Sequence, residues 1–187
     1  MTEGGRRVKS EYIPKKALEH VLALLTWENE LVMRVCLHTG LRVGDVVSLR
    51  APVKRQFWVT ESKTQKRRRV NLTQDLVDAL NTNAGVTPWC FPGRLDPIGQ
   101  HRTRQAVWAD VDRARKALRL PVNVSPHSAR KIYAVQELSK SGDLDAVRRR
   151  LNHDDAATTS IYIMAEALYR AKYEQAPGGR TRKRRKR

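Results

Sequence analysis

Residues 151–162 read LNHDDAATTSIY, a string that places a histidine nine residues ahead of a tyrosine. A second string, HSAR at residues 127–130, places His127 and Arg130 three apart, so that both side chains lie on one face of a helix. Far upstream, Arg42 closes the string TGLR. No single residue here is specific, but the ordered set of two arginines, two histidines and a phenol suits cleavage of a phosphodiester by a tyrosine.

The charge of the chain indicates a polyanionic partner. Among 187 residues, 37 are Lys or Arg and 19 are Asp or Glu, which gives a net charge of +18. Residues 180–187 hold seven basic residues and no acidic one, so +11 remains on the rest of the chain. An excess of this size binds phosphates by releasing their counterions. Composition by itself leaves DNA and RNA open as the partner.

Length and hydropathy predict one domain in an aqueous, reducing compartment. A chain of this length can bury a sizeable core. No apolar run is long enough to span a bilayer, and the polar first ten residues do not resemble a signal peptide. Cys36 and Cys90 lie far apart and are predicted to be free, buried thiols. We therefore expect a cytoplasmic location, at the DNA of the nucleoid if DNA is the partner, without membrane contact.

The spacing of apolar residues predicts a mainly α-helical fold with a small antiparallel β-sheet, an α+β domain. Strands at 57–60 and 67–72 flank a polar turn and form a hairpin, with a third strand expected near 50–55. Cap residues set several helix ends: Gly40 and Gly142 follow helices, and Ser125-Pro126 precedes the helix that carries His127. The expected helices run over about 14–25, 28–38, 43–49, 73–80, 103–118, 125–141, 143–151 and 156–175.

Phosphodiester cleavage sets three chemical requirements. The reaction needs a nucleophile, positive charge around the phosphorus and a proton for the leaving oxygen. Arginine suits the second requirement, because its guanidinium stays charged and forks onto two phosphate oxygens. Asp154 and Asp155 follow His153 directly, which is only a weak metal signal. The sequence therefore predicts a site that holds no metal.

The strings around these residues resemble those of the tyrosine recombinase (phage-integrase-like) family. TGLRVGD at 39–45 resembles the first arginine box of the family, and PHSAR at 126–130 resembles the second. KTQK at 63–66, followed by a basic strand, resembles the hairpin that carries the family's lysine, and 151–162 resembles the last box almost throughout. The resemblance extends from about residue 14 to 175 and implies the fold of a tyrosine recombinase catalytic domain.

The resemblance also implies a role for each residue. Tyr162 attacks the phosphorus, forming a 3′-phosphotyrosyl bond and freeing a 5′-hydroxyl, and His127 is the base that helps a phenol with an ordinary pKa of about 10 to lose its proton. Arg42 and Arg130 clamp the non-bridging oxygens. The remaining roles are His153 as a further hydrogen-bond donor, Lys63 as the general acid and Asp45 as the group that orients Arg42. No cofactor is implied, and Lys66 and Lys54 stay open as rivals of Lys63.

Double-stranded DNA is the partner that the resemblance implies. The predicted phosphate contacts are Lys66, Arg67, Arg68 and Arg69 on the second strand and Arg180, Arg182, Lys183, Arg184 and Arg185 in the tail, with a solvated strand edge and a solubilising tail as the plainer alternatives. A homo-oligomer is expected, dimeric on a site and tetrameric in a synapse, with accessory DNA-bending proteins as optional partners. The helix with Ile163, Met164, Ala167 and Leu168 packs either on a neighbouring protomer or on its own core.

The expected organisation is a flexible start at 1–13, a catalytic domain at 14–176 and a disordered basic tail at 177–187. Fewer than forty residues precede the first arginine box, too few for the extra DNA-binding domain of most relatives. We therefore expect a minimal recombinase or the catalytic part of a longer one. The predicted function is a site-specific DNA recombinase or integrase. The alternatives are a type IB topoisomerase or telomere resolvase, and a non-catalytic DNA-binding regulator.

Overall fold

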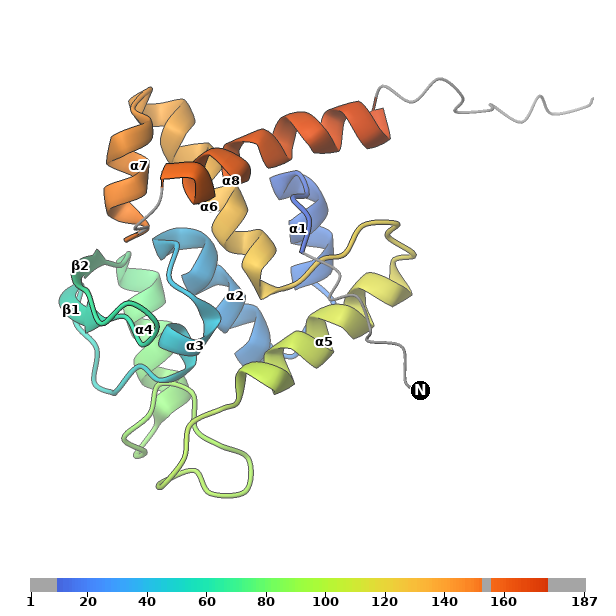
Figure 1. Cartoon of the computed structure of the whole chain (residues 1–187). Helices are drawn as coiled ribbons and strands as arrows, with labels where there is room; N and C mark the ends of the chain where they lie inside the picture. The colour runs from blue at the N-terminus through green and yellow to red at the C-terminus, as the bar shows by residue number, and fades with distance from the viewer. Residues whose placement is uncertain (1–9, 153–155, 175–187) are drawn as a thin grey trace, which may run out of the picture.

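The computed structural model of the chain describes residues 10–152 and 156–174 (Figure 1). Within these residues, helices dominate and two strands form one antiparallel sheet, so the predicted fold class is confirmed. The elements, in order, are α1 (Lys15–Leu22), α2 (Trp27–Thr39), α3 (Val43–Val47), β1 (Gln56–Thr60), β2 (Arg67–Asn71), α4 (Gln74–Ala84), α5 (Arg104–Ala117), α6 (Pro126–Ser141), α7 (Leu144–Arg150), α8 (Ala156–Tyr169) and the π-helical turn η1 (Arg170–Glu174).

The sheet is the β1–β2 hairpin, in which Phe57 lies opposite Val70 and Val59 lies opposite Arg68. Val59 and Val70 are buried, so one face of the hairpin covers the core. The expected third strand near 50–55 is wrong, because in the described residues Arg50 makes only an isolated bridge, with Trp89. Pro52 has no N–H to donate to a ladder and therefore stops a strand from continuing there.

The predicted helix ends are confirmed at the caps that border the site. Gly40 follows α2 in the left-handed conformation, with φ of 66°. A Cβ at Gly40 would lie 2.3 Å from Cδ1 of Tyr133, so the position also requires the absence of a side chain. Ser125 and Pro126 begin α6, and the Ser125 side chain accepts the N–H of His127 at 3.2 Å. These caps fix the backbone just ahead of Arg42 and His127.

The helices pack around one main core with α2 and α6 in contact at its centre (Figure 1). Helix α8 crosses α6 and also touches α7, and the hairpin lies on the side of the molecule that α3 and α4 share. The last helix was predicted as continuous to 175, but α8 ends at Tyr169 and changes to the turn η1. Cys36 and Cys90 are free and buried, as predicted. No helix in the described part is long and apolar enough to cross a membrane.

Candidate active site

Tyr162 and His127 form the centre of the candidate site. The Tyr162 hydroxyl, from α8, is hydrogen-bonded to Nε2 of His127 in the first turn of α6, and the two rings meet edge to face with centroids 5.3 Å apart. The tyrosine ring packs in a small apolar cluster with Ala134, Val147 and Leu151 and is only 7% exposed. The cluster therefore holds the ring while the hydroxyl points at a group able to accept its proton.

The second arginine is fixed from two sides. Arg130 is 1% exposed, and its guanidinium donates to the carbonyl of Gly40 and, at 2.6 Å, to the carbonyl of Leu151. These carbonyls belong to the loop after α2 and to the end of α7. The arginine thus ties together three segments that are far apart in the sequence. A guanidinium held by backbone oxygens keeps its charge and its orientation without a neutralising carboxylate at those two contacts.

Arg42 and Arg130 both line a pocket of about 740 Å³. Arg42 stands at the N-cap of α3 and forms an ion pair with Glu61. The pocket is lined by Arg42, Lys63, His127 and Arg130, and from α5 by Arg104, Gln105 and Trp108. Among the described residues, the rival lysines Lys54 and Lys66 do not line it. The structure therefore brings together four predicted residues, with the Tyr162 hydroxyl bonded to one of them.

Burial and positive charge set the protonation of these groups. The His127 side chain is exposed at the pocket, and desolvation by the protein around its ring, followed by the charges of Arg130 and Lys131, lowers its pKa to about 4. Burial raises the pKa of Tyr162, while Arg130 and Arg42 oppose that rise. Burial likewise lowers the pKa of Arg130, to about 10. Near neutral pH the imidazole is neutral and able to accept the phenol proton, but its lowered pKa also makes it a weaker base.

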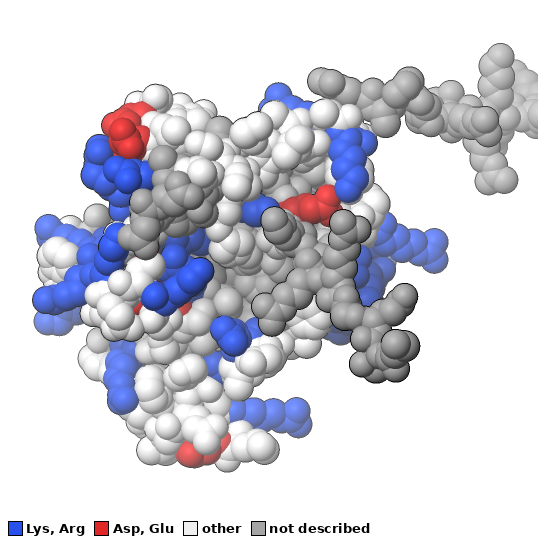
Figure 2. Space-filling model, viewed as in Figure 1, with Lys and Arg blue, Asp and Glu red and all other residues white. Residues whose placement is uncertain are grey.

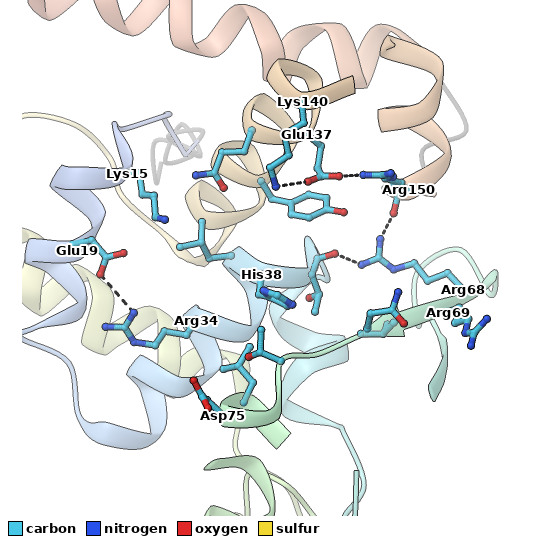
Figure 3. Close-up of a pocket in the computed structure, with 18 residues that line it drawn as sticks. Lys15, Glu19, Arg34, His38, Arg68, Arg69, Asp75, Glu137, Lys140 and Arg150 are labelled. Atoms are coloured by element: carbon cyan, nitrogen blue, oxygen red, sulfur yellow. Dashed lines mark hydrogen bonds and ion pairs between the residues drawn. The ribbon is translucent and has the colours of Figure 1, made fainter. Parts of the chain in front are cut away.

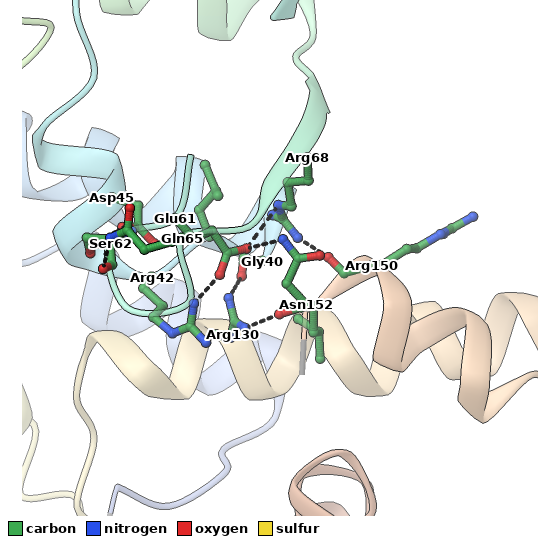
Figure 4. A network of polar contacts seen from close by, with 12 residues as sticks. Gly40, Arg42, Asp45, Glu61, Ser62, Gln65, Arg68, Arg130, Arg150 and Asn152 are labelled. Carbon is green, nitrogen blue, oxygen red and sulfur yellow. Dashed lines mark hydrogen bonds and ion pairs between the residues drawn. The ribbon is translucent and has the colours of Figure 1, made fainter. Parts of the chain in front are cut away.

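Two predicted roles need correction. The Asp45 carboxylate binds the hairpin turn instead of the Arg42 guanidinium: its Oδ1 accepts the backbone N–H of Ser62 at 2.9 Å and the Ser62 hydroxyl at 2.7 Å (Figure 4). The contact between Asp45 and Arg42 is a backbone one, in which the N–H of Asp45 donates to the Arg42 carbonyl at 2.9 Å. Asp45 therefore anchors the turn next to Lys63. Arg68 is also misassigned as a DNA contact, because its guanidinium turns inward and donates to the carbonyls of Thr39 and Arg150. The cause is strand alternation, which puts Arg68 on the same face as buried Val70.

Two residues that the sequence did not single out belong to the site. Glu61 is completely buried and binds Arg42 and Arg68. Lys131 is buried, donates to the carbonyl of Ser10 and lies 5.7 Å from the centroid of the Tyr162 ring. The position of Lys131, directly after Arg130, could have suggested its location, but no local pattern marked Glu61.

Several predicted residues lie outside the described part of the chain. They are His153 in the last box and Arg180, Arg182, Lys183, Arg184 and Arg185 in the tail. Their roles stay predictions. Asn152, next to His153, is described and donates to Glu61 at 3.2 Å.

A second pocket, of about 830 Å³, lies between α1, α2, β2, α4 and α6 (Figure 3). Charges of both signs line it and pair with one another. Arg34 lies 3.5 Å from Glu19, and Glu137 binds Lys140 at 3.1 Å and also Arg150. Six Lys and Arg side chains and three acidic ones line the pocket, so these pairs neutralise only part of its positive charge.

Comparison with known proteins places the chain in a family. The model of the phage integrase family matches residues 13–168. A putative integrase/recombinase y4qK of Sinorhizobium fredii is 30% identical over an alignment of 154 residues that covers 78% of this chain and 49% of that protein. Tyrosine recombinase XerD of Agrobacterium fabrum is 30% identical over 166 residues, covering 74% of this chain and 50% of that protein. The chain thus spans about half the length of these relatives.

Solved structures share the fold at low identity. A lambda integrase dimer bound to a COC' core site aligns with a TM-score of 0.72 at 17% identity, covering 86% of this chain and 50% of that one. XerA recombinase aligns with a TM-score of 0.67 at 20% identity, covering 91% and 66%. Together with the family match over most of the sequence, these likenesses lead to one conclusion: the chain belongs to the phage integrase family.

Proposed function

We propose that the chain is the DNA-cleaving and DNA-rejoining part of a site-specific recombinase or integrase. The observation that carries the proposal is the bond of the Tyr162 hydroxyl to His127, beside a pocket that Arg42, Lys63 and Arg130 line. Family membership supports the same activity. Relatives at 30% identity are named as a tyrosine recombinase and as a putative integrase/recombinase.

The proposed reaction uses only side chains of the chain. The Tyr162 oxygen attacks the phosphorus, and its proton passes to Nε2 of His127, which is neutral because its pKa is lowered. The bond from phosphorus to the 5′-oxygen breaks, and Lys63 gives that oxygen a proton. Arg42 and Arg130 stabilise the charge that develops on the non-bridging oxygens, which is usually the largest catalytic contribution. His153 would add a further donor.

The covalent intermediate allows rejoining. The 3′-phosphotyrosyl bond conserves the phosphodiester energy, so the 5′-hydroxyl of a second DNA end can attack it and release Tyr162. Because cleavage and rejoining reverse one another, neither ATP nor another energy source is required. Exchange between two duplexes then needs at least two active sites in one assembly. Lambda integrase is described as a dimer on a core site and as a tetramer on a Holliday junction, and the same assemblies are proposed for this chain, with DNA-bending proteins as optional accessories.

The exposed basic residues of the hairpin supply the proposed DNA surface. Figure 2 shows Lys and Arg side chains gathered on the side of the molecule that carries β1 and β2. Lys66, Arg67 and Arg69 are exposed there, close in sequence to Lys63. Phosphate contacts at these residues would hold the duplex over the pocket, and the basic tail would add contacts without sequence preference. The protein would then be located at DNA in the cytoplasm.

One experiment tests the activity. The protein is incubated with a nicked suicide duplex that carries its site, denatured and examined for a covalent protein–DNA adduct. We expect an adduct with the wild-type protein and none with Tyr162→Phe, while the affinity for the duplex stays within about threefold, because removal of one hydroxyl leaves the phosphate contacts in place. An adduct that persists in Tyr162→Phe would contradict the proposed nucleophile. Tyr169→Phe, outside the pocket, is the matched control and should form the adduct.

The products separate the alternative functions. Exchanged sites support a recombinase, relaxed supercoils a type IB topoisomerase, and hairpin ends a telomere resolvase. Binding without any adduct, in every tested duplex, would support a non-catalytic regulator with this fold.

A further inference from the structure

Glu61 is a buried carboxylate at the meeting point of three segments. It follows β1 directly, is 0% exposed, and its Oε2 forms an ion pair with Arg42. Its Oε1 lies 3.5 Å from Nε of Arg68 and accepts the side-chain N–H of Asn152 at 3.2 Å (Figure 4). The carboxylate therefore links the start of α3, the second strand of the hairpin and the loop after α7.

Each of these segments carries a residue of the proposed mechanism. Arg42 is itself one of the phosphate-binding arginines. Lys63 stands two residues after Glu61 on the turn of the hairpin, and His153 follows Asn152 in the sequence. Taking a carboxylate out of water is costly, so its burial requires several good donors. Glu61 has them, but a pair of apolar side chains would stabilise such a junction at least as well. A role in the reaction explains why a charge stands there.

We propose that Glu61 is the positioning residue of Arg42. It holds the Arg42 guanidinium at the edge of the pocket before DNA arrives, and it holds the turn with Lys63 closed against the same pocket. Asp45 is the acidic residue to which the sequence analysis gave this role, but its carboxylate accepts hydrogen bonds from Ser62 instead. The inference rests on the proposed function, since it concerns how that active site is prepared.

The physical reason is preorganisation. Arg42 is only partly buried and its long side chain has many rotamers, whereas Arg130 is fixed by two carbonyls. Without Glu61, Arg42 would have to become ordered during the reaction, and the free-energy cost of that ordering would raise the activation barrier. A misplacement of about 1 Å in such a group costs roughly a hundredfold in rate. The effect should fall on the cleavage step, because bulk phosphate contacts set the affinity for the duplex.

The test is a double-mutant cycle on Glu61 and Arg42. Glu61→Gln keeps the shape of the side chain but replaces one acceptor oxygen by an amide donor. The single remaining oxygen cannot accept from Arg42 and also from Arg68 and Asn152. The four proteins are wild type, Glu61→Gln, Arg42→Ala and the double variant. For each, the dissociation constant for the duplex and the adduct-forming rate constant at saturating suicide duplex are measured. Thermal unfolding checks that each protein is folded.

We expect Glu61→Gln to lower the rate constant by about ten- to a hundredfold and to change the dissociation constant by less than about threefold. In the Arg42→Ala background the same substitution should lower the rate constant by less than about threefold, because the partner has already been removed. A wild-type rate constant in Glu61→Gln would overturn the proposal. So would an equal loss in both backgrounds, which would identify Glu61 as a general structural support.

A matched control and a separate criterion complete the test. Asp110 also accepts several donors, the N–H of Thr26 at 2.9 Å and the side chain of Asn29 at 2.8 Å, but it does not line the pocket of Tyr162. Asp110→Asn should keep the wild-type rate constant even if it lowers the melting temperature. Failure of the proposed function is recognised independently, because the wild-type protein would then form no adduct with any duplex.

Discussion

The imidazole of His127 is kept neutral by its surroundings, and this has a consequence for stability. Burial and the neighbouring cations lower its pKa to about 4, against about 6.5 in an unfolded chain. Between these two values the unfolded chain binds a proton that the folded protein does not. The free energy of unfolding contributed by this group is therefore fully present above about pH 6.5 and is lost as the pH falls towards about 4.

Replacement of the histidine should remove this dependence. We expect wild-type protein to lose more stability between pH 7 and pH 4.5 than His127→Asn does, because asparagine does not titrate. Denaturant unfolding at the two pH values measures the difference. The contributions of the other titrating groups to the pH dependence are the same in both proteins and therefore cancel in the comparison. Equal losses in both proteins would show that the imidazole is protonated normally in the fold and would weaken its role as the base.

The residues of the site differ in how far the sequence could predict them. Arg42, His127 and Arg130 were predictable because caps and contiguous strings fix them locally. The partner of Asp45 was not, because it depends on how the hairpin turn folds back onto α3. Glu61 carries no local signal at all. Its donors Arg42, Arg68 and Asn152 come from other segments, and only the tertiary fold brings them to one carboxylate.

At the scale of elements, strand alternation divides the basic run of β2. The residues opposite one another show that Arg67 and Arg69 share the outer face with Thr60 and Trp58, while Arg68 lies opposite buried Val59. The two-residue period of a strand was visible in the sequence around Val70 and would have predicted this division. The missing third strand was a different error, since Pro52 is visible in the sequence and, because it has no N–H to donate, already argues against a strand there.

Because Arg67 and Arg69 lie on the outer face of β2 and Arg68 on the inner face, their substitutions should affect different properties, DNA binding in one case and stability in the other. Arg67→Ala combined with Arg69→Ala should weaken binding to duplex DNA and reduce the slope of log affinity against log salt by about 0.9 for each lost phosphate contact, with little effect on stability. Arg68→Ala should instead lower the free energy of unfolding by about 1–3 kcal/mol, because it leaves buried acceptors unpaired. Salt titrations and denaturant unfolding of both variants measure the two effects. A steep loss of affinity without destabilisation in Arg68→Ala would contradict the inward placement.

At the scale of the whole molecule, α8 presents two faces. Tyr162, Ala165 and Tyr169 face the protein's own core. On the other side Ile161, Met164 and Leu168 are 59%, 58% and 62% exposed, at the three- and four-residue spacing of one helix stripe. The side chain of Ile163 lies outside the described part, and Ala167 is exposed. An apolar stripe next to the nucleophile on an exposed helix is a candidate contact between protomers.

Acidic substitutions in this stripe should therefore prevent dimer formation without weakening the binding of one protomer to DNA. We expect Met164→Glu combined with Leu168→Glu to bind a half-site with wild-type affinity but to lose the dimer on a full site, because two carboxylates would have to be desolvated in the contact. Electrophoretic mobility of half-site and full-site complexes, with light scattering for their mass, distinguishes the two states. Leu95→Glu, at a still more exposed leucine in the loop before α5, is the control and should still form the dimer. A full-site dimer of undiminished stability in the double variant would mean that the stripe is only solvated surface, and the protomers would then have to meet through another face.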